Sequence, residues 1–350
     1  MREFIKGFNY GHDGVRGGYR TEAAKQSRAA MFGNGVNFIQ LAFPVFQKTF
    51  SSTEIYFDYR STMTDADLRS AAVSAHKSGI AVAIRPLLCC ADGSGRGSID
   101  FPDYTVDGRD VYWQDWFDSY TALILHYAEL AQSLGCEMLC IGSELTGTQR
   151  KTLYWRGLIA AVRGIYKGKL IYSCNYGSEE QVKWWDTLDY IGVCAYCEVG
   201  TEKTDGCGKI LEPQNPQSSQ ASQASQASLD AAVDIMIRGW ETVSRRLELV
   251  AKQHTRHVVF TEIGCRSIVG AARSPWDFVK DDAVYCEEEQ AAYIDTCLAV
   301  MTRKAWFKGA FWWGWSTEIY STKAEAQSDT SYDVHLKLAE KIIARWNTKI

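Results

Sequence analysis

The 350-residue sequence lacks the features that several large classes of protein require. It contains no run of 18 apolar residues, so we expect no segment that crosses a membrane. Its net charge of −4 indicates no cationic surface, and we expect neither nucleic acid nor a membrane as a partner. No G-x-G-x-x-G motif opens the first predicted helix and no G-x-x-x-x-G-K-[ST] motif occurs, which argues against the nucleotide-binding α/β folds.

The N-terminal residues 1–10 also lack the apolar stretch of a secretory signal peptide. We therefore expect a cytoplasmic protein, and a secreted one would need a leader ahead of the sequence given. The 11 cysteines are scattered through strand-like and helix-like segments, as expected for small buried side chains in a reducing compartment. Cys194 and Cys197 have C-x-x-C spacing, but no second such pair accompanies them, so a structural role is the simpler interpretation.

Strand-like and helix-like segments alternate along most of the chain. Short apolar segments typical of buried strands occur at residues 4–9, 37–43, 80–84, 137–142, 170–174, 190–196, 257–263 and 309–315. Helical patterns are found at residues 21–32, 65–78, 113–130, 153–166, 233–250, 287–303 and 336–346. Regular alternation predicts a parallel sheet, and eight units in this length favour a closed (β/α)8 TIM barrel. We expect a single domain over residues 1–350.

Capping residues, glycines and prolines set the expected ends of several helices and strands. Thr64 is a suitable N-cap, and Gly135 a suitable C-terminal stop, for the helices beside them. The second strand is predicted to end before Pro44, and the third at Arg85 and Pro86. Residues 214–228 contain three consecutive Ser-Gln-Ala triplets, so we expect a low-complexity loop insertion at about residues 212–228 on the surface.

Two predicted strands end on a glutamate, Glu144 and Glu262. A buried parallel strand is normally apolar throughout, and the active site of a (β/α)8 barrel lies at the C-terminal ends of its strands. We therefore expect both carboxylates at one cleft. The alternative is that each is only a helix N-terminal residue favoured by the helix dipole.

Other strand ends carry polar and aromatic residues suited to a carbohydrate. These are Asn9, Tyr10, Arg85, Asn175, Tyr196, Trp312, Trp313 and Trp315. Strand alternation should point at least one of the three tryptophans outward. The strand ends include no compact His/Asp/Glu set and no nucleophilic Ser or Cys with a His partner, so we expect no metal and no other cofactor. Two facing carboxylates are typical of glycoside hydrolysis, in which one protonates the leaving oxygen and the other attacks carbon or activates water.

Four short motifs resemble glycoside hydrolase family 113. They are Gly-Ser-Glu-Leu at 142–145, Leu-Asp-Tyr-Ile-Gly at 188–192, Phe-Thr-Glu-Ile-Gly at 260–264 and Phe-Trp-Trp-Gly-Trp at 311–315. Residues 120–131 and the Pro-Trp pair at 275–276 are also similar to that family. The resemblance runs over nearly the whole chain. It implies a retaining (β/α)8 glycosidase, mainly of the β-1,4-mannanase type.

The resemblance also implies roles for individual residues. Glu144 would be the acid/base and Glu262 the nucleophile. Tyr196 would donate a hydrogen bond to the nucleophile, and a tryptophan of the last strand would form the floor of the −1 subsite. Ser143 stands where the wider superfamily usually has an asparagine that contacts the sugar 2-hydroxyl, and the axial 2-hydroxyl of mannose makes a different partner reasonable. The predicted substrate-binding residues are Asn9, Tyr10, Arg85, Ser143, Asn175, Tyr196, Trp313 and Trp315.

The sequence thus predicts a retaining hydrolase of β-1,4-mannosidic linkages in mannan or manno-oligosaccharides. One alternative is a β-glucoside or β-xyloside hydrolase on the same barrel. A second is a non-catalytic carbohydrate-binding barrel, in which the two glutamates need not approach to the ~5–5.5 Å of a retaining pair. A third is a metal-dependent barrel hydrolase, which a chelator would inactivate. Endo and exo cleavage both stay open.

Overall fold

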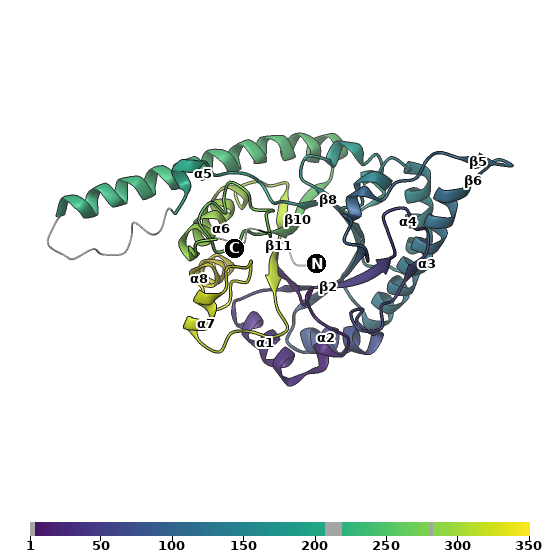
Figure 1. The fold of residues 1–350 in the computed structure, drawn as a ribbon, viewed down its shortest axis with the longest axis horizontal. Helices are drawn as coiled ribbons and strands as arrows, with labels where there is room; N and C mark the ends of the chain where they lie inside the picture. Colours follow the sequence, from purple (N-terminus) through teal and green to yellow (C-terminus); the bar gives the residue numbers. More distant parts are fainter. Residues whose placement is uncertain (1–3, 207–218, 280–282) are drawn as a thin grey trace.

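Eight parallel strands close into a barrel surrounded by helices (Figure 1). The computed structural model describes residues 4–206, 219–279 and 283–350. In order around the barrel, the strands are β1 (Ile5–Tyr10), β2 (Phe38–Gln47), β4 (Ala81–Cys90), β7 (Met138–Ser143), β8 (Lys169–Asn175), β9 (Tyr190–Cys194), β10 (His257–Ile263) and β11 (Phe307–Trp315). Because β1 pairs with both β2 and β11, the barrel is closed. The predicted (β/α)8 fold is confirmed.

Side chains inside the barrel form an apolar layer below a polar one. The apolar layer is made by Ile5, Phe38, Ala83, Met138, Cys140, Ile171, Val259 and Phe311. Two or more residues further along several of the same strands, the inward positions are polar, as at Asn9, Gln40 and Arg85. The outward positions join a much larger apolar core against the helices. The barrel is therefore filled by side chains, with its buried polar groups toward the C-terminal mouth, where (β/α)8 barrels carry their sites.

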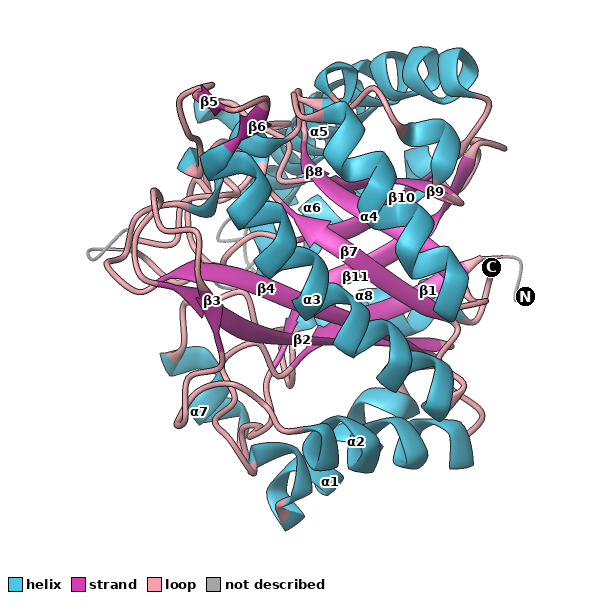
Figure 2. Ribbon diagram, turned by 90° about the vertical axis from the view of Figure 1, so that its right-hand side faces the viewer, coloured by secondary structure: helices cyan, strands magenta, loops and turns pink. Residues whose placement is uncertain are grey.

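All seven predicted helices are present, together with one short helix at Lys323–Ser328 that the sequence patterns do not predict. The helices are α1 (Glu22–Gly33), α2 (Asp65–Lys77), α3 (Val111–Leu134), α4 (Thr152–Ile165), α5 (Ser219–His254), α6 (Glu287–Met301), α7 (Lys323–Ser328) and α8 (Leu338–Asn347). In Figure 2, α3 and α4 lie in front of the barrel strands. Thr64 caps α2 by accepting a hydrogen bond from Asp67 N, and Gly135 ends α3 with a φ of 67°, both as predicted. No helix in the described part of the chain combines the length and apolar character needed to cross a membrane.

The connection between β8 and β9 differs from the regular alternation. It contains two short 3₁₀ helices, Glu179–Gln181 and Trp185–Thr187, in place of an α-helix. Trp184 and Trp185 are fully buried there, and the Trp184 ring stacks on Trp155 of α4 at 4.8 Å. Large aromatic rings thus cover the outside of β8 without a full helix.

Neither proline ends its strand, so this prediction is wrong. Strand β2 continues through Pro44 to Gln47, and β4 continues through Pro86 to Cys90, with the two strands paired throughout. Pairing of β2 with β1 ends at Leu41, and pairing of β4 with β7 ends at Ile84. Each proline therefore lies where one edge of its strand has left the barrel ladder, and a missing N–H is tolerated at such an edge.

The low-complexity segment is helical where the structure describes it. Helix α5 begins at Ser219 and includes the Ser-Gln-Ala triplets, so the predicted loop is wrong for residues 219–228, while residues 212–218 lie outside the described residues. Figure 1 shows this end of α5 continuing beyond the barrel. Alanine and glutamine are good helix formers, and the segment runs without a breaker into the amphipathic stretch that packs on the barrel.

Candidate active site

Glu262 reaches the barrel mouth because strand β10 is irregular. Val259 and Thr261 point inward, so simple alternation would turn Glu262 outward. The register of β10 against β9 shifts between Phe260 and Glu262, which is a β-bulge that turns the carboxylate back into the barrel. The Tyr196 hydroxyl donates to Glu262 Oε2 at 2.8 Å, and Arg85 Nη2 donates to Oε1.

The bulge is held by a buried polar network on the barrel floor. The carbonyl oxygen of Thr261 accepts hydrogen bonds from Asn9 Nδ2 (3.0 Å), Gln40 Nε2 (3.0 Å) and Arg85 Nη1 (2.9 Å). Gln40 Nε2 and Arg85 Nη1 also donate to Asn9 Oδ1, at 2.5 and 3.0 Å. Strands β1, β2 and β4 thereby hold the peptide that precedes Glu262, and they fix the direction of its side chain.

Arg85 is the centre of this network and is fully buried. Besides its bonds to Glu262 and the floor, its Nη2 donates to Ser143 Oγ at 2.6 Å. Ser143 is likewise buried, directly before Glu144 at the end of β7. Its hydroxyl joins the strand of one carboxylate to the arginine that holds the other.

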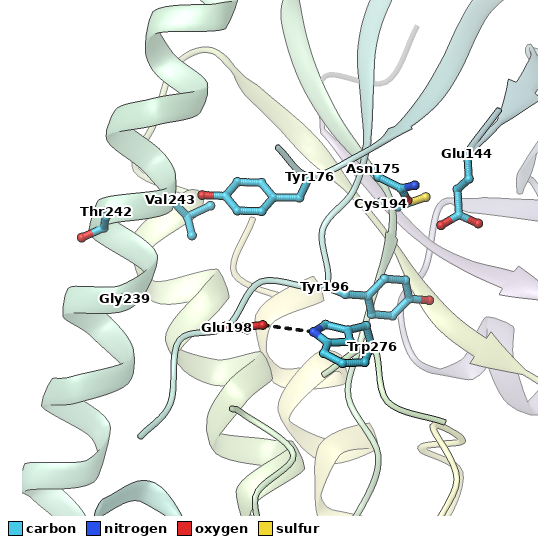
Figure 3. A pocket seen from close by; sticks show the side chains of 10 residues that line it. All are labelled: Glu144, Asn175, Tyr176, Cys194, Tyr196, Glu198, Gly239, Thr242, Val243 and Trp276. Carbon is cyan, nitrogen blue, oxygen red and sulfur yellow. Dashed lines mark hydrogen bonds between the residues drawn. The ribbon is translucent and has the colours of Figure 1, made fainter. Parts of the chain in front are cut away.

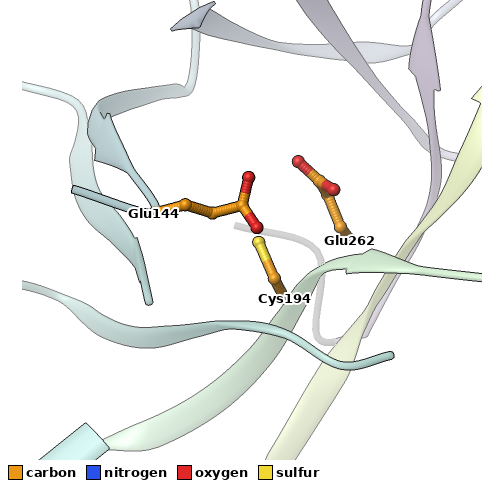
Figure 4. A group of neighbouring side chains, drawn as sticks. All are labelled: Glu144, Cys194 and Glu262. Atoms are coloured by element: carbon orange, nitrogen blue, oxygen red, sulfur yellow. The ribbon is translucent and has the colours of Figure 1, made fainter. Parts of the chain in front are cut away.

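Glu144 occupies the opposite side of the mouth. Its φ of 57° is in the left-handed region that a non-glycine residue seldom adopts, and it follows immediately on strand β7. The ligand atoms of Glu144, Cys194 and Glu262 all lie within 4.8 Å of one another, so the two carboxylates face each other closely (Figure 4). Burial, and next the charge of Glu262, raise the pKa of Glu144 above that of an ordinary carboxyl group.

A cavity of about 640 Å³ opens from Glu144 toward helix α5. Figure 3 shows its lining residues: Glu144, Asn175, Tyr176, Cys194, Tyr196, Glu198, Gly239, Thr242, Val243 and Trp276. Arg246 lies over the Tyr176 ring at 4.9 Å, and Trp276 Nε1 donates to Glu198 Oε1 at 3.2 Å. Two aromatic side chains fixed by charged partners along a cleft are suited to sugar rings.

Six of the eight predicted binding residues gather at this mouth. Asn9, Arg85 and Ser143 form the floor; Asn175 and Tyr196 line the cavity. Trp313 is half-buried, and its ring lies 4.1 Å from that of His12, centroid to centroid.

Tyr10 and Trp315 are not at the mouth, so these two predictions are wrong. Tyr10 points outward by ordinary alternation, and its hydroxyl donates to the Ala24 carbonyl in α1. Strand alternation would place Trp315 on the same inward face as Trp313. The register of β11 against β1, however, shifts between Phe8 and Tyr10. The shift turns Trp315 outward, where its Nε1 donates to Ser27 Oγ at 3.0 Å.

Sequence reasoning missed Gln40, Cys194, Glu198 and His12. Gln40 carried a signal, because it is the one polar residue in the apolar run 38–43. The C-x-x-C spacing of Cys194 favours only a structural role, and Glu198 lies beyond the end of β9 without a motif of its own. The His12 ring lies against Trp313 at an interplanar angle of 44°, and burial lowers the pKa of His12, which favours a neutral imidazole. Only the folded barrel brings these four residues to the floor and walls of the mouth.

Glu144, Cys194 and Glu262 also have ligand types that metals use. Arg85 Nη2 lies against Glu262 and 3.7 Å from Cys194 Sγ, and Arg96 Nη1 lies 3.9 Å from Glu144 Oε2. Two guanidinium groups thus supply positive charge to the same set, which opposes the binding of a cation there.

The fold is a closed (β/α)8 barrel. At its C-terminal mouth two glutamates face each other, above a buried arginine and beside aromatic walls. Together these features define the class of barrel glycosidases. A model of Glycoside Hydrolase Family 113 matches residues 8–337. The chain therefore belongs to glycoside hydrolase family 113, and the predicted resemblance is confirmed.

Solved structures agree with the family. The GH113 β-mannanase AaManA from Alicyclobacillus acidocaldarius, in complex with ManMIm, is 30% identical with a TM-score of 0.83, over 99% of this chain and 98% of that chain. A structure of a GH113 β-1,4-mannanase is 29% identical with a TM-score of 0.84, over 100% of both chains. A β-glucuronidase from Ruminococcus gnavus, 13% identical with a TM-score of 0.60 over 98% of this chain and 49% of that one, shares the fold alone. The comparison with curated proteins yields no match.

Proposed function

We propose that this glycoside hydrolase cleaves β-1,4-mannosidic linkages in mannan or manno-oligosaccharides by a retaining double displacement. The observation that carries the mechanism is the approach of Glu144 and Glu262, whose nearest oxygens lie within 4.8 Å. A retaining pair needs a separation of ~5–5.5 Å so that one carboxylate reaches the anomeric carbon, whereas an inverting pair needs ~6.5–9.5 Å to admit a water. The sugar assignment is supported by the β-mannanases of the same family that cover the full chain.

The two carboxylates have different surroundings, and these suit different roles. Glu262 accepts a hydrogen bond from Arg85 on Oε1 and one from Tyr196 on Oε2, and together they orient the carboxylate for attack on the anomeric carbon. Burial, and next the charge of Glu262, raise the pKa of Tyr196 well above its usual value, so the phenol stays protonated and donates. Glu144, whose pKa is raised, is the group that carries a proton to the leaving oxygen.

The cavity indicates which side of the cleft receives the leaving sugar. It is lined by Glu144 and not by Glu262, and it extends to Tyr176 and α5. The acid/base acts on the leaving-group side of the scissile bond. We therefore assign the cavity to the leaving-group sugars, which supports an oligosaccharide or polysaccharide substrate over a simple mannoside. This chemistry requires no metal or organic cofactor.

The test is the stereochemistry and sugar dependence of hydrolysis. Proton NMR during cleavage of mannotetraose should show the β-anomer of the new reducing end first, before mutarotation. Initial release of the α-anomer would contradict the retaining mechanism. Mannobiose or mannotriose should be cleaved at least about tenfold faster than the matching cello- and xylo-oligosaccharides, and the reverse ranking would overturn the mannosidic assignment.

We also propose a cytoplasmic location, in which the enzyme acts on imported manno-oligosaccharides. Buried thiols such as Cys140 and Cys174 support a reducing compartment. Fractionation of the source cells with an antibody to the protein would test this, and recovery from the culture medium would contradict it.

A further inference from the structure

Arg96 is a second arginine at the site, and the roles assigned so far do not use it. It begins the short 3₁₀ helix η2 (Arg96–Ser98) in the loop after β4. Its Nη1 lies 3.9 Å from Glu144 Oε2, and its Nη2 donates to Cys89 Sγ at 3.5 Å. Arg85, by contrast, belongs to the barrel floor and bonds Glu262 directly.

The fold holds Arg96 in a fixed relation to Glu144. The loop with η2 packs tightly against η3 (Thr146–Thr148), the turn that follows Glu144. A Cβ added to Gly147 would lie 2.2 Å from the carbonyl oxygen of Ile99, so only glycine permits this approach. Arg150, just after η3, bridges back to the first loop through Asp100, Asp103 and the Phe101 carbonyl. The two loops therefore behave as one unit.

Four groups face the Glu144 carboxylate, each from a different element. Glu262 comes from β10, Arg85 from β4, Cys194 from β9 and Arg96 from the η2 loop. Burial and the Glu262 charge raise the pKa of Glu144, and the positive charges of Arg96 and Arg85 act in the opposite direction. The balance favours the protonated acid, as the first displacement requires.

That balance changes during the reaction. Once Glu262 forms its ester with the sugar, it carries no charge, and one of the two causes that raise the pKa of Glu144 is gone. Arg96 and Arg85 remain. The second displacement needs Glu144 as a carboxylate, because it must remove a proton from water.

We propose that Arg96 is a positioning residue for Glu144 that stabilises its carboxylate form in the second displacement. The inference rests on the proposed retaining mechanism. In that step Glu144 takes a proton from water while the water oxygen bonds the anomeric carbon. The bond between that carbon and the Glu262 oxygen breaks, and its electron pair returns to Glu262 as the free carboxylate.

The test uses Arg96→Gln, which removes the charge, and Arg96→Lys, which keeps it. With 2,4-dinitrophenyl β-mannoside the leaving group needs no acid, so the second step is expected to limit kcat. The Gln variant should keep a full burst of dinitrophenol, while its kcat at pH values below the optimum falls about tenfold. The acid limb of its kcat profile should move up by about one pH unit, because a cation ~4 Å away no longer lowers the pKa of the carboxyl. Azide, which needs no base, should restore kcat, and the Lys variant should stay close to the wild type.

Arg156→Gln is the matched control, since it removes the charge of a partly exposed arginine that pairs with Asp186 and takes no part in the contact between the two loops. Its acid limb should stay where the wild type has it. The proposal is wrong if Arg96→Gln leaves the acid limb unmoved, if azide fails to restore its kcat, or if Arg156→Gln moves the limb equally. Failure of the proposed mechanism looks different, because the wild type itself would then show no burst and no sugar ester on Glu262.

Discussion

At the scale of single residues, the two glutamates of the site have identical side chains but different neighbours. Glu262 is bonded by an arginine and a phenol, while Glu144 lies on the cavity side with Arg96 Nη1 3.9 Å from its Oε2. The local structures differ as well, a β-bulge for Glu262 and a left-handed residue for Glu144. Under the proposed mechanism, these surroundings, and not the side-chain type, assign the attack to Glu262 and the proton transfer to Glu144.

The two roles predict opposite products when azide rescues each variant. Glu262→Ala should lose about 10⁴-fold or more of its activity on aryl β-mannosides, and azide should then yield the α-mannosyl azide, because it replaces the nucleophile directly. Glu144→Ala should still form the glycosyl–enzyme with an activated leaving group, and azide should yield the β-mannosyl azide. NMR of the products checks the assignment.

Exchanged configurations would show that the two roles are reversed. Glu180, which is exposed in the loop after β8, offers a matched control. Its change to alanine should leave activity within about twofold of the wild type, because surface substitutions rarely perturb a distant site.

At the scale of elements, helix α5 does more than cover the barrel. Its residues Gly239, Thr242 and Val243 line the cavity opposite Glu144, while its apolar face packs on the barrel through Trp240 and Leu247. Arg246 lies one turn after Val243. Its guanidinium group packs over the ring of Tyr176 and forms an ion pair of 2.8 Å with Glu179. One helix thus builds both the core and one wall of the substrate cleft.

A bulky residue on that wall should obstruct leaving-group sugars selectively. Val243→Trp is expected to lower kcat/KM for mannotetraose by about ten- to a hundredfold, because the chain of sugars can no longer lie in the cleft. The same change should leave kcat/KM for an aryl β-mannoside within about twofold. Leu249→Trp, at a position 70% exposed on the same helix, is the control and should affect neither substrate. Equal losses on both substrates would contradict the assigned side of the cleft.

At the scale of the whole molecule, strand β11 both closes the barrel and contributes a side chain to the site. β11 pairs with β1 to complete the ring, and it carries Trp313 toward the mouth and Trp315 toward the helices. Trp315 is fully buried, with its ring 5.0 Å from Phe8 and its indole N–H on Ser27 of α1. We therefore expect Trp315 to contribute to stability and Trp313 to contribute to substrate binding.

Alanine substitutions should separate these two contributions. Trp315→Ala is expected to cost about 3–5 kcal/mol of unfolding free energy, because it leaves a large cavity between β11 and α1, while the enzyme that remains folded keeps most of its activity. Trp313→Ala should cost much less stability and lose most activity on manno-oligosaccharides. Denaturant melts and kcat/KM values measured on both variants would test this, and a stable but inactive Trp315→Ala enzyme would contradict it.

The sequence by itself determined the barrel and the two glutamates proposed to be catalytic. Apolar periodicity is a local property, and the rule that parallel strands present their C-terminal ends at one face then brings Glu144 and Glu262 together. Asn9, Arg85, Ser143, Asn175, Tyr196 and Trp313 could be found for the same reason, since each lies at or near a strand end.

Only the tertiary structure decided the rest. The inward turn of Glu262 and the outward turn of Trp315 both follow from register shifts against a neighbouring strand, which no spacing within one segment encodes. Pro44 and Pro86 are tolerated because pairing with one adjacent strand ends before each of them, and Arg96 reaches Glu144 because two loops far apart in sequence pack together. These features depend on which segments become neighbours, and that is settled when the barrel closes.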